Sequence, residues 1–217
     1  MMKQIIIVAG GSPKYWPEMS SYKKNETFWV GVDRGAWFLL ENGITPDYAV
    51  GDFDSLSVEE FKTISEVVSE VVKAPREKDE TDTQLGLKIA MSECDDCPII
   101  LIGATGGRMD HLMANFWLML EPRFQEISQR FMIKDNQNSI TFYQSGSHVV
   151  EKEGDKDYLG FLCVTPVADL TLRGVKYPLN NYQAAYPISF ASNEFIEGYA
   201  NFEFSSGVVV VVQSKDK

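Results

Sequence analysis

The sequence Lys-Gln-Ile-Ile-Ile-Val-Ala-Gly-Gly-Ser, residues 3–12, places a short apolar run directly before two glycines. Such a run, bounded by turn residues, is typical of a buried strand that ends in a tight turn. Comparable runs recur through the first half of the chain, at residues 27–32, 48–50, 70–73 and 98–102. Because longer mixed segments separate them, we predict strands joined by crossover helices in a mainly parallel sheet.

The segments between these strands carry helix signals. We predict helices at residues 35–41, in the stretch that follows Ser57, at 81–93 and at 110–120. Ser57 and Glu60 have the spacing of a capping box, and Gly43 is placed to cap the end of the first helix. Pro122 disfavours helical geometry in Glu121, so we expect the last helix to end there.

The pattern changes at residue 131, where β-rich segments separated by turn residues replace the helices. We therefore predict two domains: an α/β domain over residues 1–125 and an all-β domain over residues 131–217. A short polar connector is expected to join them.

The composition is that of a folded globular chain, with 217 residues, 44% hydrophobic and 24% charged. Lys and Arg number 20 against 31 Asp and Glu, and the resulting formal charge of −11 disfavours a duplex nucleic-acid partner. The longest apolar runs are far shorter than the roughly 20 residues that a membrane helix needs, and no signal-peptide pattern precedes them. We expect a cytoplasmic protein with neither a nucleic-acid nor a membrane partner.

Three cysteines do not make a disulfide framework for a chain of this size, so we expect reduced thiols. Cys94 and Cys97 have a zinc-like spacing, but no second Cys or His pair completes four ligands. Their spacing therefore indicates a surface loop.

Polar clusters follow the predicted strands at equivalent points. They are Gly10-Gly11-Ser12, Asp33-Arg34, Gly51 to Ser55, Lys78 to Asp82 and Gly103 to Asp110. Ligands of open α/β sheets bind at the carboxyl ends of the strands, so we expect these clusters to form one site.

Asp52 and Asp54 are two residues apart, which in an extended segment puts both carboxylates on one side. Together with Asp33 and Asp82 they would suit Mg²⁺, which takes one or two carboxylates along with substrate phosphates. The alternative is a turn before a helix, where Asp is common in any case. Carboxylates would repel a polyphosphate unless divalent cations lay between them, so phosphoryl or pyrophosphoryl transfer is the leading reaction class.

The turn Gly106-Gly107-Arg108 would let backbone amides approach an anion, and the Arg108 guanidinium suits phosphate oxygens. A flexible helix-entry loop is the alternative. For His111, which follows Asp110, a functional role and a structural role are equally supported by the sequence. In the second domain Ser189, Ser192 and Asn193 lie in a polar stretch for which the residues alone favour a turn.

Taken in order, five motifs resemble the thiamine pyrophosphokinase family over nearly the whole chain. They are Val32-Asp33-Arg34-Gly35-Ala36, Gly51-Asp52-Phe53-Asp54-Ser55, Lys78-Asp79-Glu80-Thr81-Asp82-Thr83, Gly106-Gly107-Arg108-Met109-Asp110-His111 and Ser192-Asn193-Glu194-Phe195. The resemblance implies a Rossmann-like three-layer α/β domain with a mainly parallel sheet, followed by a β-sandwich domain. It also implies pyrophosphoryl transfer from ATP to the hydroxyl of thiamine, giving thiamine diphosphate and AMP, with Mg²⁺ as cofactor and a homodimer with sites near the subunit interface.

The resemblance, together with position at the strand ends, assigns the site residues. Asp33, Asp52, Asp54 and Asp82 are expected to bind metal; Asp54, Asp82, Arg108 and Asp110 to be catalytic; Gly10, Gly11, Arg34, Lys78, Thr105, Gly106, Gly107 and Arg108 to bind the nucleotide; and Thr81, Gln84, Ser189, Ser192 and Asn193 to bind thiamine. Arg34 stands where many members carry a small residue, so it either contacts phosphate or pairs with a nearby acid. No discrete general base is assigned, with Asp54 and Asp110 favoured.

Two rival hypotheses stay open on the sequence alone. A metal-dependent phosphohydrolase would use the same aspartates to activate water, although Leu56 stands where the aspartyl-phosphate hydrolases carry Thr. A non-catalytic nucleotide or thiamine sensor would bind without chemistry. Four convergent carboxylates argue against the sensor, because ligand binding alone rarely needs them.

Overall fold

The computed structural model describes residues 2–75, 77 and 79–216. The chain divides into two compact units. The first comprises residues up to Leu118 together with Ile133–Asn136, and the second comprises Met119–Met132 together with the residues from Gln137 onward. This division differs by several residues from the predicted domains 1–125 and 131–217, and the separate functions assigned to those domains stay predictions.

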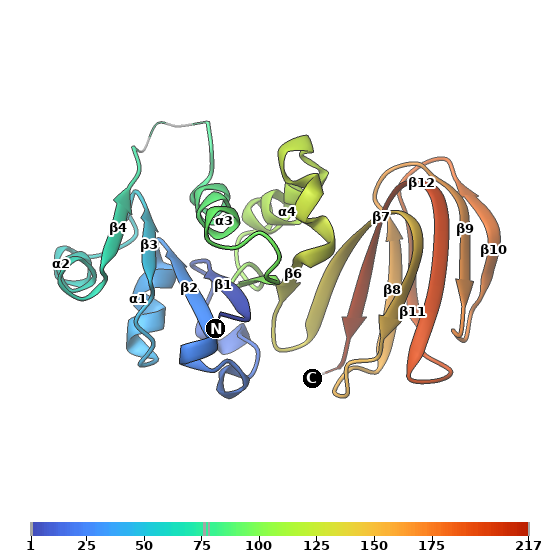
Figure 1. Cartoon of the computed structure of the whole chain (residues 1–217), viewed down its shortest axis with the longest axis horizontal. Coiled ribbons are helices and arrows are strands. Elements are labelled where there is room, and N and C mark those ends of the chain that lie inside the picture. Colours follow the sequence, from blue (N-terminus) through green and yellow to red (C-terminus); the bar gives the residue numbers. More distant parts are fainter. Residues whose placement is uncertain (1, 76, 78, 217) are drawn as a thin grey trace. The chain divides into compact units, whose positions relative to one another are not determined.

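The first unit is built on a parallel sheet (Figure 1). Its strands are β1 (Gln4–Val8), β2 (Thr27–Val32), β3 (Tyr48–Gly51), β4 (Glu70–Lys73) and β5 (Ile99–Ile102), in the order β5-β1-β2-β3-β4. The strand β6 (Phe131–Lys134), of which Ile133 and Lys134 belong to this unit, follows β5 in the sheet order. The pairs β1–β2, β1–β5, β2–β3 and β3–β4 are all parallel, which confirms the predicted α/β sheet. The sequence analysis did not place β6 in this sheet.

Helices cover both faces of the sheet. They are α1 (Arg34–Glu41), α2 (Val58–Val67), α3 (Asp82–Glu93) and α4 (Met109–Trp117). Leu39 of α1 packs in one apolar cluster with Ile6 and Val8 of β1. Gly86 of α3 lies instead against Ile7, whose side chain points to the opposite face because strand residues alternate. The unit therefore has the three layers that were expected.

Local signals account for most helix ends. Ser57 and Glu60 form the predicted capping box at the start of α2. The predicted last helix is shorter than expected, because α4 ends at Trp117 and the turn Leu118–Leu120 is 3-10 helix. Short 3-10 helices that the sequence analysis did not predict occur at Pro13–Tyr15, Met19–Ser21 and Lys24–Glu26.

The segment that precedes β6 has regular structure that the sequence did not predict, and the expected polar connector stays a prediction. Residues Pro122–Arg130 form a 3-10 helix that buries Phe124 and Ile127 in the second unit. These apolar side chains are separated by three positions, so one face of the segment packs inward while its charged residues stay exposed.

The second unit is an antiparallel β-sandwich. Its strands are β7 (Asn138–Glu151), β8 (Tyr158–Cys163), β9 (Val167–Arg173), β10 (Leu179–Ala184), β11 (Ile188–Asn193) and β12 (Tyr199–Ser214). β12 pairs with β7 along its length, with β9 in its first half and with β8 in its second half. Phe161 of β8 and Phe202 of β12 pack edge to face in the core. β7 and β12 are longer than the short segments predicted, because a register shift near residues 204–208 lets one strand serve both halves.

The cysteines correct one expectation. Cys94 and Cys97, which follow α3, form a disulfide with Cα atoms 5.6 Å apart. This separation lies within the range that a disulfide spans, whereas the sequence analysis expected reduced thiols. Cys163 is a free, buried thiol, and burial raises its pKa to about 11.

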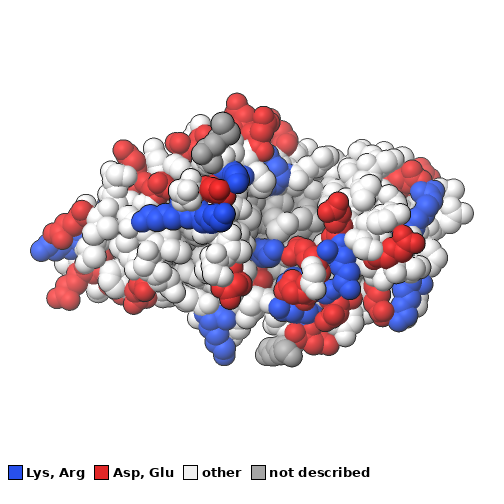
Figure 2. Space-filling model, turned by 60° about the horizontal axis from the view of Figure 1, so that its bottom comes forward, with Lys and Arg blue, Asp and Glu red and all other residues white. Residues whose placement is uncertain are grey.

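The surface gives no sign of a continuous basic region over the described residues of the face in Figure 2, where acidic and basic side chains are interspersed. In the described part of the chain, no helix has the length and apolar character needed to cross a membrane. The cytoplasmic location stays a prediction.

The start of α1 allows a stability test of the fold. A Cβ on Gly35 would lie 2.0 Å from the carbonyl oxygen of Val8, a backbone atom that cannot move aside cheaply. We expect Gly35→Ala to lower the free energy of unfolding by about 1–3 kcal/mol, as measured by urea denaturation. The control is Gly154→Ala, because a Cβ there meets nothing within 4 Å. Equal stability of the two variants would contradict the close approach of α1 to β1.

Candidate active site

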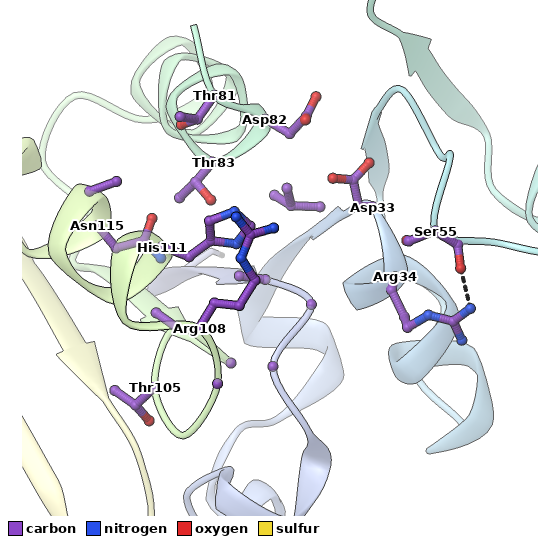
Figure 3. Close-up of a pocket in the computed structure, with 18 of the residues that line it drawn as sticks. Asp33, Arg34, Ser55, Thr81, Asp82, Thr83, Thr105, Arg108, His111 and Asn115 are labelled. Atoms are coloured by element: carbon purple, nitrogen blue, oxygen red, sulfur yellow. Dashed lines mark hydrogen bonds between the residues drawn. The ribbon is translucent and has the colours of Figure 1, made fainter. Parts of the chain in front are cut away.

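A cavity of about 550 Å³ lies in the first unit (Figure 3). It is lined by the carboxyl ends of β1, β2 and β5, by the loop after β3, by the first turns of α1 and α3, and by one face of α4. The predicted residues that line it are Gly10, Gly11, Asp33, Arg34, Asp54, Thr81, Asp82, Thr105, Gly107 and Arg108. Most of the polar clusters singled out in the sequence therefore meet in one place.

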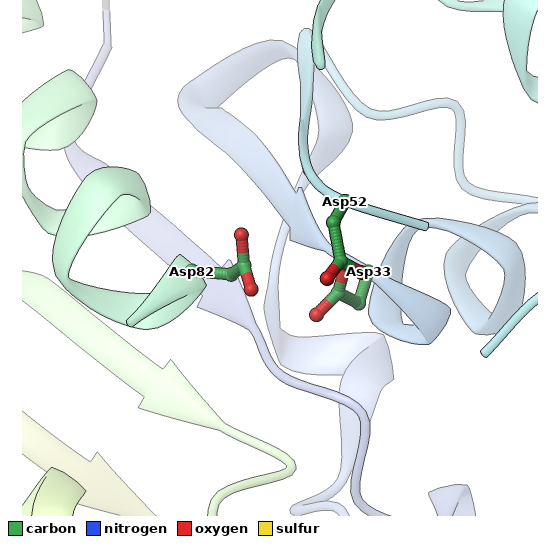
Figure 4. Close-up of side chains that lie close together, drawn as sticks. All are labelled: Asp33, Asp52 and Asp82. Atoms are coloured by element: carbon green, nitrogen blue, oxygen red, sulfur yellow. The ribbon is translucent and has the colours of Figure 1, made fainter. Parts of the chain in front are cut away.

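Three carboxylates gather beside this cavity (Figure 4). One oxygen from each of Asp33, Asp52 and Asp82 lies within 4.8 Å of the others. The three residues come from separate elements: the end of β2, the loop after β3 and the first residue of α3. Hard oxygen donors at this spacing fit a divalent cation such as Mg²⁺.

Asp54 does not join this group of three. The expectation that Asp52 and Asp54 face one side assumed an extended segment, but Phe53 between them has a positive φ of 57°. The chain therefore turns between the two aspartates. Asp54 lines the cavity, and its backbone N–H donates to Asp52 Oδ1 at 3.0 Å.

Asp33 is held in an uncommon backbone conformation, with φ at 49°. Such conformations cost free energy for a non-glycine residue and concentrate at functional sites. Asp33 Oδ1 accepts a hydrogen bond from the backbone N–H of Phe53 at 3.2 Å. A Cβ on Gly51, whose φ is 153°, would lie 2.0 Å from the same oxygen, so glycine at this position makes room for the carboxylate.

Asp82 is oriented by the start of α3. The Thr81 hydroxyl accepts from the Gln84 backbone N–H at 3.2 Å, and Gln84 Oε1 accepts from the Thr81 N–H at 2.8 Å. This capping box fixes the helix terminus that carries Asp82. Gln84 is not among the residues that line the cavity, so its predicted contact with thiamine gains no support here.

Arg108 and Asp110 form an exposed bidentate pair. Arg108 Nε and Nη2 donate to the two Asp110 carboxylate oxygens at 3.1 and 2.5 Å. These hydrogen bonds lower the pKa of Asp110 below its ordinary value and raise that of Arg108. Arg108 lines the cavity whereas Asp110 does not, so Asp110 orients the guanidinium from outside.

Two glycine-containing loops, after β1 and after β5, line the cavity. The Gly11 N–H donates to the Gly103 carbonyl at 2.8 Å, which ties the loop after β1 to the loop after β5. The Thr105 hydroxyl donates to the buried carboxylate of Asp135 at 2.8 Å. Asp135 was not singled out in the sequence, because it lies in the segment that we assigned to the second domain. Gly106 is part of the same loop but does not itself line the cavity.

Arg34 pairs with an acid, which is one of its two predicted roles. Its guanidinium lies 3.4 Å from Glu60 Oε1 and donates to the Ser55 backbone carbonyl. Figure 3 shows this side chain directed toward Ser55. Lys78, predicted to bind the nucleotide, lies outside the described residues.

The residues predicted in the second unit lie on β11. Ser192 lines a separate pocket of about 500 Å³ within that unit, and Ser189 does not. Asn193 is buried, with its side chain bonded to both the N–H and the carbonyl of Tyr177 at 2.9 Å. Its amide therefore serves the fold, and the predicted thiamine contact of Asn193 gains no support from this geometry.

The sequence analysis missed two polar residues of the cavity, Thr83 and Asn115, and left His111 undecided. His111 and Asn115 are four positions apart and lie on one face of α4. This spacing is the signal that could have found Asn115, which interrupts an otherwise apolar run.

Comparison with known proteins gives consistent results. Residues 19–131 match the family model described as "Thiamin pyrophosphokinase, catalytic domain", and residues 147–209 match "Thiamin pyrophosphokinase, vitamin B1 binding domain". A Bacillus subtilis (strain 168) protein named thiamine pyrophosphokinase is 36% identical over 217 residues, which cover 99% of this chain and 100% of that protein.

Solved structures agree. A thiamin pyrophosphokinase family protein from Enterococcus faecalis has a TM-score of 0.94 at 49% identity, with 99% of this chain and 100% of that chain covered. Thiamin pyrophosphokinase from Geobacillus thermodenitrificans has a TM-score of 0.85 at 37% identity, with 98% of each chain covered. These matches confirm the resemblance that the sequence motifs indicated, and the chain belongs to the thiamin pyrophosphokinase family.

Proposed function

We propose that this chain transfers a pyrophosphoryl group from ATP to the hydroxyl of thiamine, giving thiamine diphosphate and AMP. The observation that carries the proposal is the group Asp33, Asp52 and Asp82, which stands beside the same cavity as Arg108. This arrangement supplies both a cation site and a phosphate-binding guanidinium. Membership of the family supports thiamine as the acceptor of the pyrophosphoryl group and ATP as its donor.

The three carboxylates are the residues that would hold Mg²⁺. When bound, the ion supplies charge neutralisation for the polyphosphate. The side chains contribute geometry, because Asp33 is fixed by the Phe53 N–H and Asp82 by the start of α3. Because these carboxylates are already held in place, they need not reorient when negative charge develops on the transferring phosphate group.

Transfer requires the thiamine oxygen to attack the β-phosphorus while the bond from that phosphorus to the α–β bridging oxygen breaks. AMP carries away the bridging oxygen, and the hydroxyl proton goes to a base. Arg108 is suited to bind oxygens of the transferring group through its planar donor fork.

Asp54 is the better placed of the two favoured bases. It lines the cavity, whereas Asp110 does not and is held by Arg108 with a lowered pKa. A carboxylate with a lowered pKa is a weaker proton acceptor. We therefore assign proton acceptance to Asp54 and the orientation of Arg108 to Asp110.

The proposal has three further parts. Thr81 and Ser192 recognise thiamine, the chain forms a homodimer with its sites near the subunit interface, and the protein is cytoplasmic. Thr81 lines the cavity of the first unit, and Ser192 lines the pocket of the second. The phosphohydrolase and sensor alternatives are not favoured, because the matched families are named for pyrophosphokinase activity.

Phosphorus NMR of the products formed from ATP and Mg²⁺, with and without thiamine, tests the function directly. Thiamine-dependent AMP together with a new diphosphate ester is the expected result, and a metal-free sample should show neither. ADP or free phosphate formed without thiamine would identify a hydrolase, and saturable binding without turnover would identify a sensor.

The carboxylate group gives a sharper test. We expect Asp82→Asn to lower the turnover number at least about 100-fold and to raise the Mg²⁺ concentration needed for half-maximal rate, because one charged ligand is lost. Asp96→Asn makes the same chemical change at an exposed position outside the cavity and should leave both quantities unchanged. An Asp82→Asn enzyme with normal rate and metal dependence would exclude the proposed site.

Ser192 tests the role of the second unit. We expect Ser192→Ala to raise the KM for thiamine by about 5- to 10-fold, the loss of one hydrogen bond, with little change in the KM for ATP. Ser147→Ala, at an exposed position of β7, is the matched control. An unchanged thiamine KM in the Ser192 variant would remove this residue from the thiamine site.

A further inference from the structure

Asn115 on α4 is a buried polar side chain in the wall of the cavity. It is 7% exposed and lines the cavity. Among the residues that the structure describes, none forms a hydrogen bond with its carboxamide. Figure 3 shows the side chain projecting from α4 into the cavity, on the side where Thr83 and His111 lie.

The position is one where an apolar residue would be expected. Its neighbours in α4 are Leu112, Met113, Ala114, Phe116 and Trp117. The carboxamide atoms of Asn115 are not sealed inside the protein but open onto the cavity. A side chain that is almost wholly buried yet presents its amide to the cavity is placed to hydrogen-bond a ligand there.

The surroundings of Asn115 differ from the phosphate end of the cavity. Within the described part of the chain, the Thr83 hydroxyl and the His111 ring also have no hydrogen-bond partner, and Thr83 is 9% exposed. The Asn115 amide and the Thr83 hydroxyl carry neither a negative charge to bind metal nor a positive charge to bind phosphate, whereas Asp33 and Asp82 lie at the cation site. This wall is suited to a neutral polar part of a substrate rather than to phosphate or metal.

A carboxamide offers one acceptor and one donor side by side. It pairs in bidentate fashion with an amino group next to a ring nitrogen, as asparagine does with adenine. Both proposed substrates carry this arrangement, ATP in adenine and thiamine in its aminopyrimidine ring. We propose that Asn115, with Thr83 and His111 beside it, forms a specificity subsite that binds the aminopyrimidine edge of a substrate. The proposal rests on the function proposed above for the identity of the two candidate ligands.

Equilibrium binding to the full-length protein in the presence of Mg²⁺ tests this subsite. The probes are ATP against purine riboside triphosphate, which lacks the amino group, and thiamine against its analogue without the 4′-amino group. We expect the wild-type protein to prefer one amino-bearing ligand by about 10- to 100-fold, and Asn115→Leu to abolish that preference. A nucleotide effect assigns adenine to the subsite, and a thiamine effect assigns the aminopyrimidine of thiamine.

Two further variants keep the test decisive. Asn115→Asp retains the size but loses the donor, and it should also reduce the preference if the leucine variant does not fold. Asn42→Leu repeats the substitution at an exposed residue of the first unit that lies outside the cavity, and it should behave as wild type. Retention of the wild-type preference in the Asn115 variants, or the absence of any preference for an amino-bearing ligand in the wild-type protein, would overturn the proposal. Because binding is read without turnover, this failure is distinct from an absence of thiamine-dependent AMP in the product assay.

Discussion

The mutual repulsion of three carboxylates is the constraint on which the rest of this site depends. Asp33, Asp52 and Asp82 place oxygens within 4.8 Å of one another, a separation at which like charges repel and at which a bound cation would relieve that repulsion. The fold sustains this arrangement because β2, β3 and the segment entering α3 all deliver their polar ends to one edge of a parallel sheet. Gly51 and the positive φ of Asp33 are local adjustments that bring the carboxylates together.

The cationic groups around the cavity are restrained in different ways. Arg34 is bound to Glu60 and to a backbone carbonyl, so it braces α1 against the loop after β3. Among the described residues, the exposed Asp110 is the acid that pairs with Arg108, in an ion pair that solvent screens and that a phosphate can replace at small cost. The two arginines therefore have separate tasks, one structural and one directed at the ligand. The chain's net charge of −11 makes such a local cationic group necessary for a polyphosphate ligand.

The sequence predicted the parallel sheet and the meeting of polar clusters well, because strand ends followed by Gly and Asp are local signals. The sequence did not predict features that depend on how distant parts of the chain pack or on individual backbone angles. The positive φ of Phe53 breaks the extended geometry that was assumed for Asp52 and Asp54, and the alternation of strand side chains cannot predict that angle. The burial of Asn115 depends on how α4 packs, the Cys94–Cys97 disulfide depends on the turn after α3, and the length of β12 depends on its register shift. Asp135 reaches Thr105 from 30 residues away, a contact that sequence spacing does not reveal.

The most direct test of the central claim is a crystal structure of the protein with Mn²⁺ and a non-hydrolysable ATP analogue, with the metal located by its anomalous scattering. The account predicts a peak within coordination distance of Asp33, Asp52 and Asp82, with the analogue's phosphates on the opposite side of the ion. A metal held by the phosphates alone, away from all three carboxylates, would contradict it.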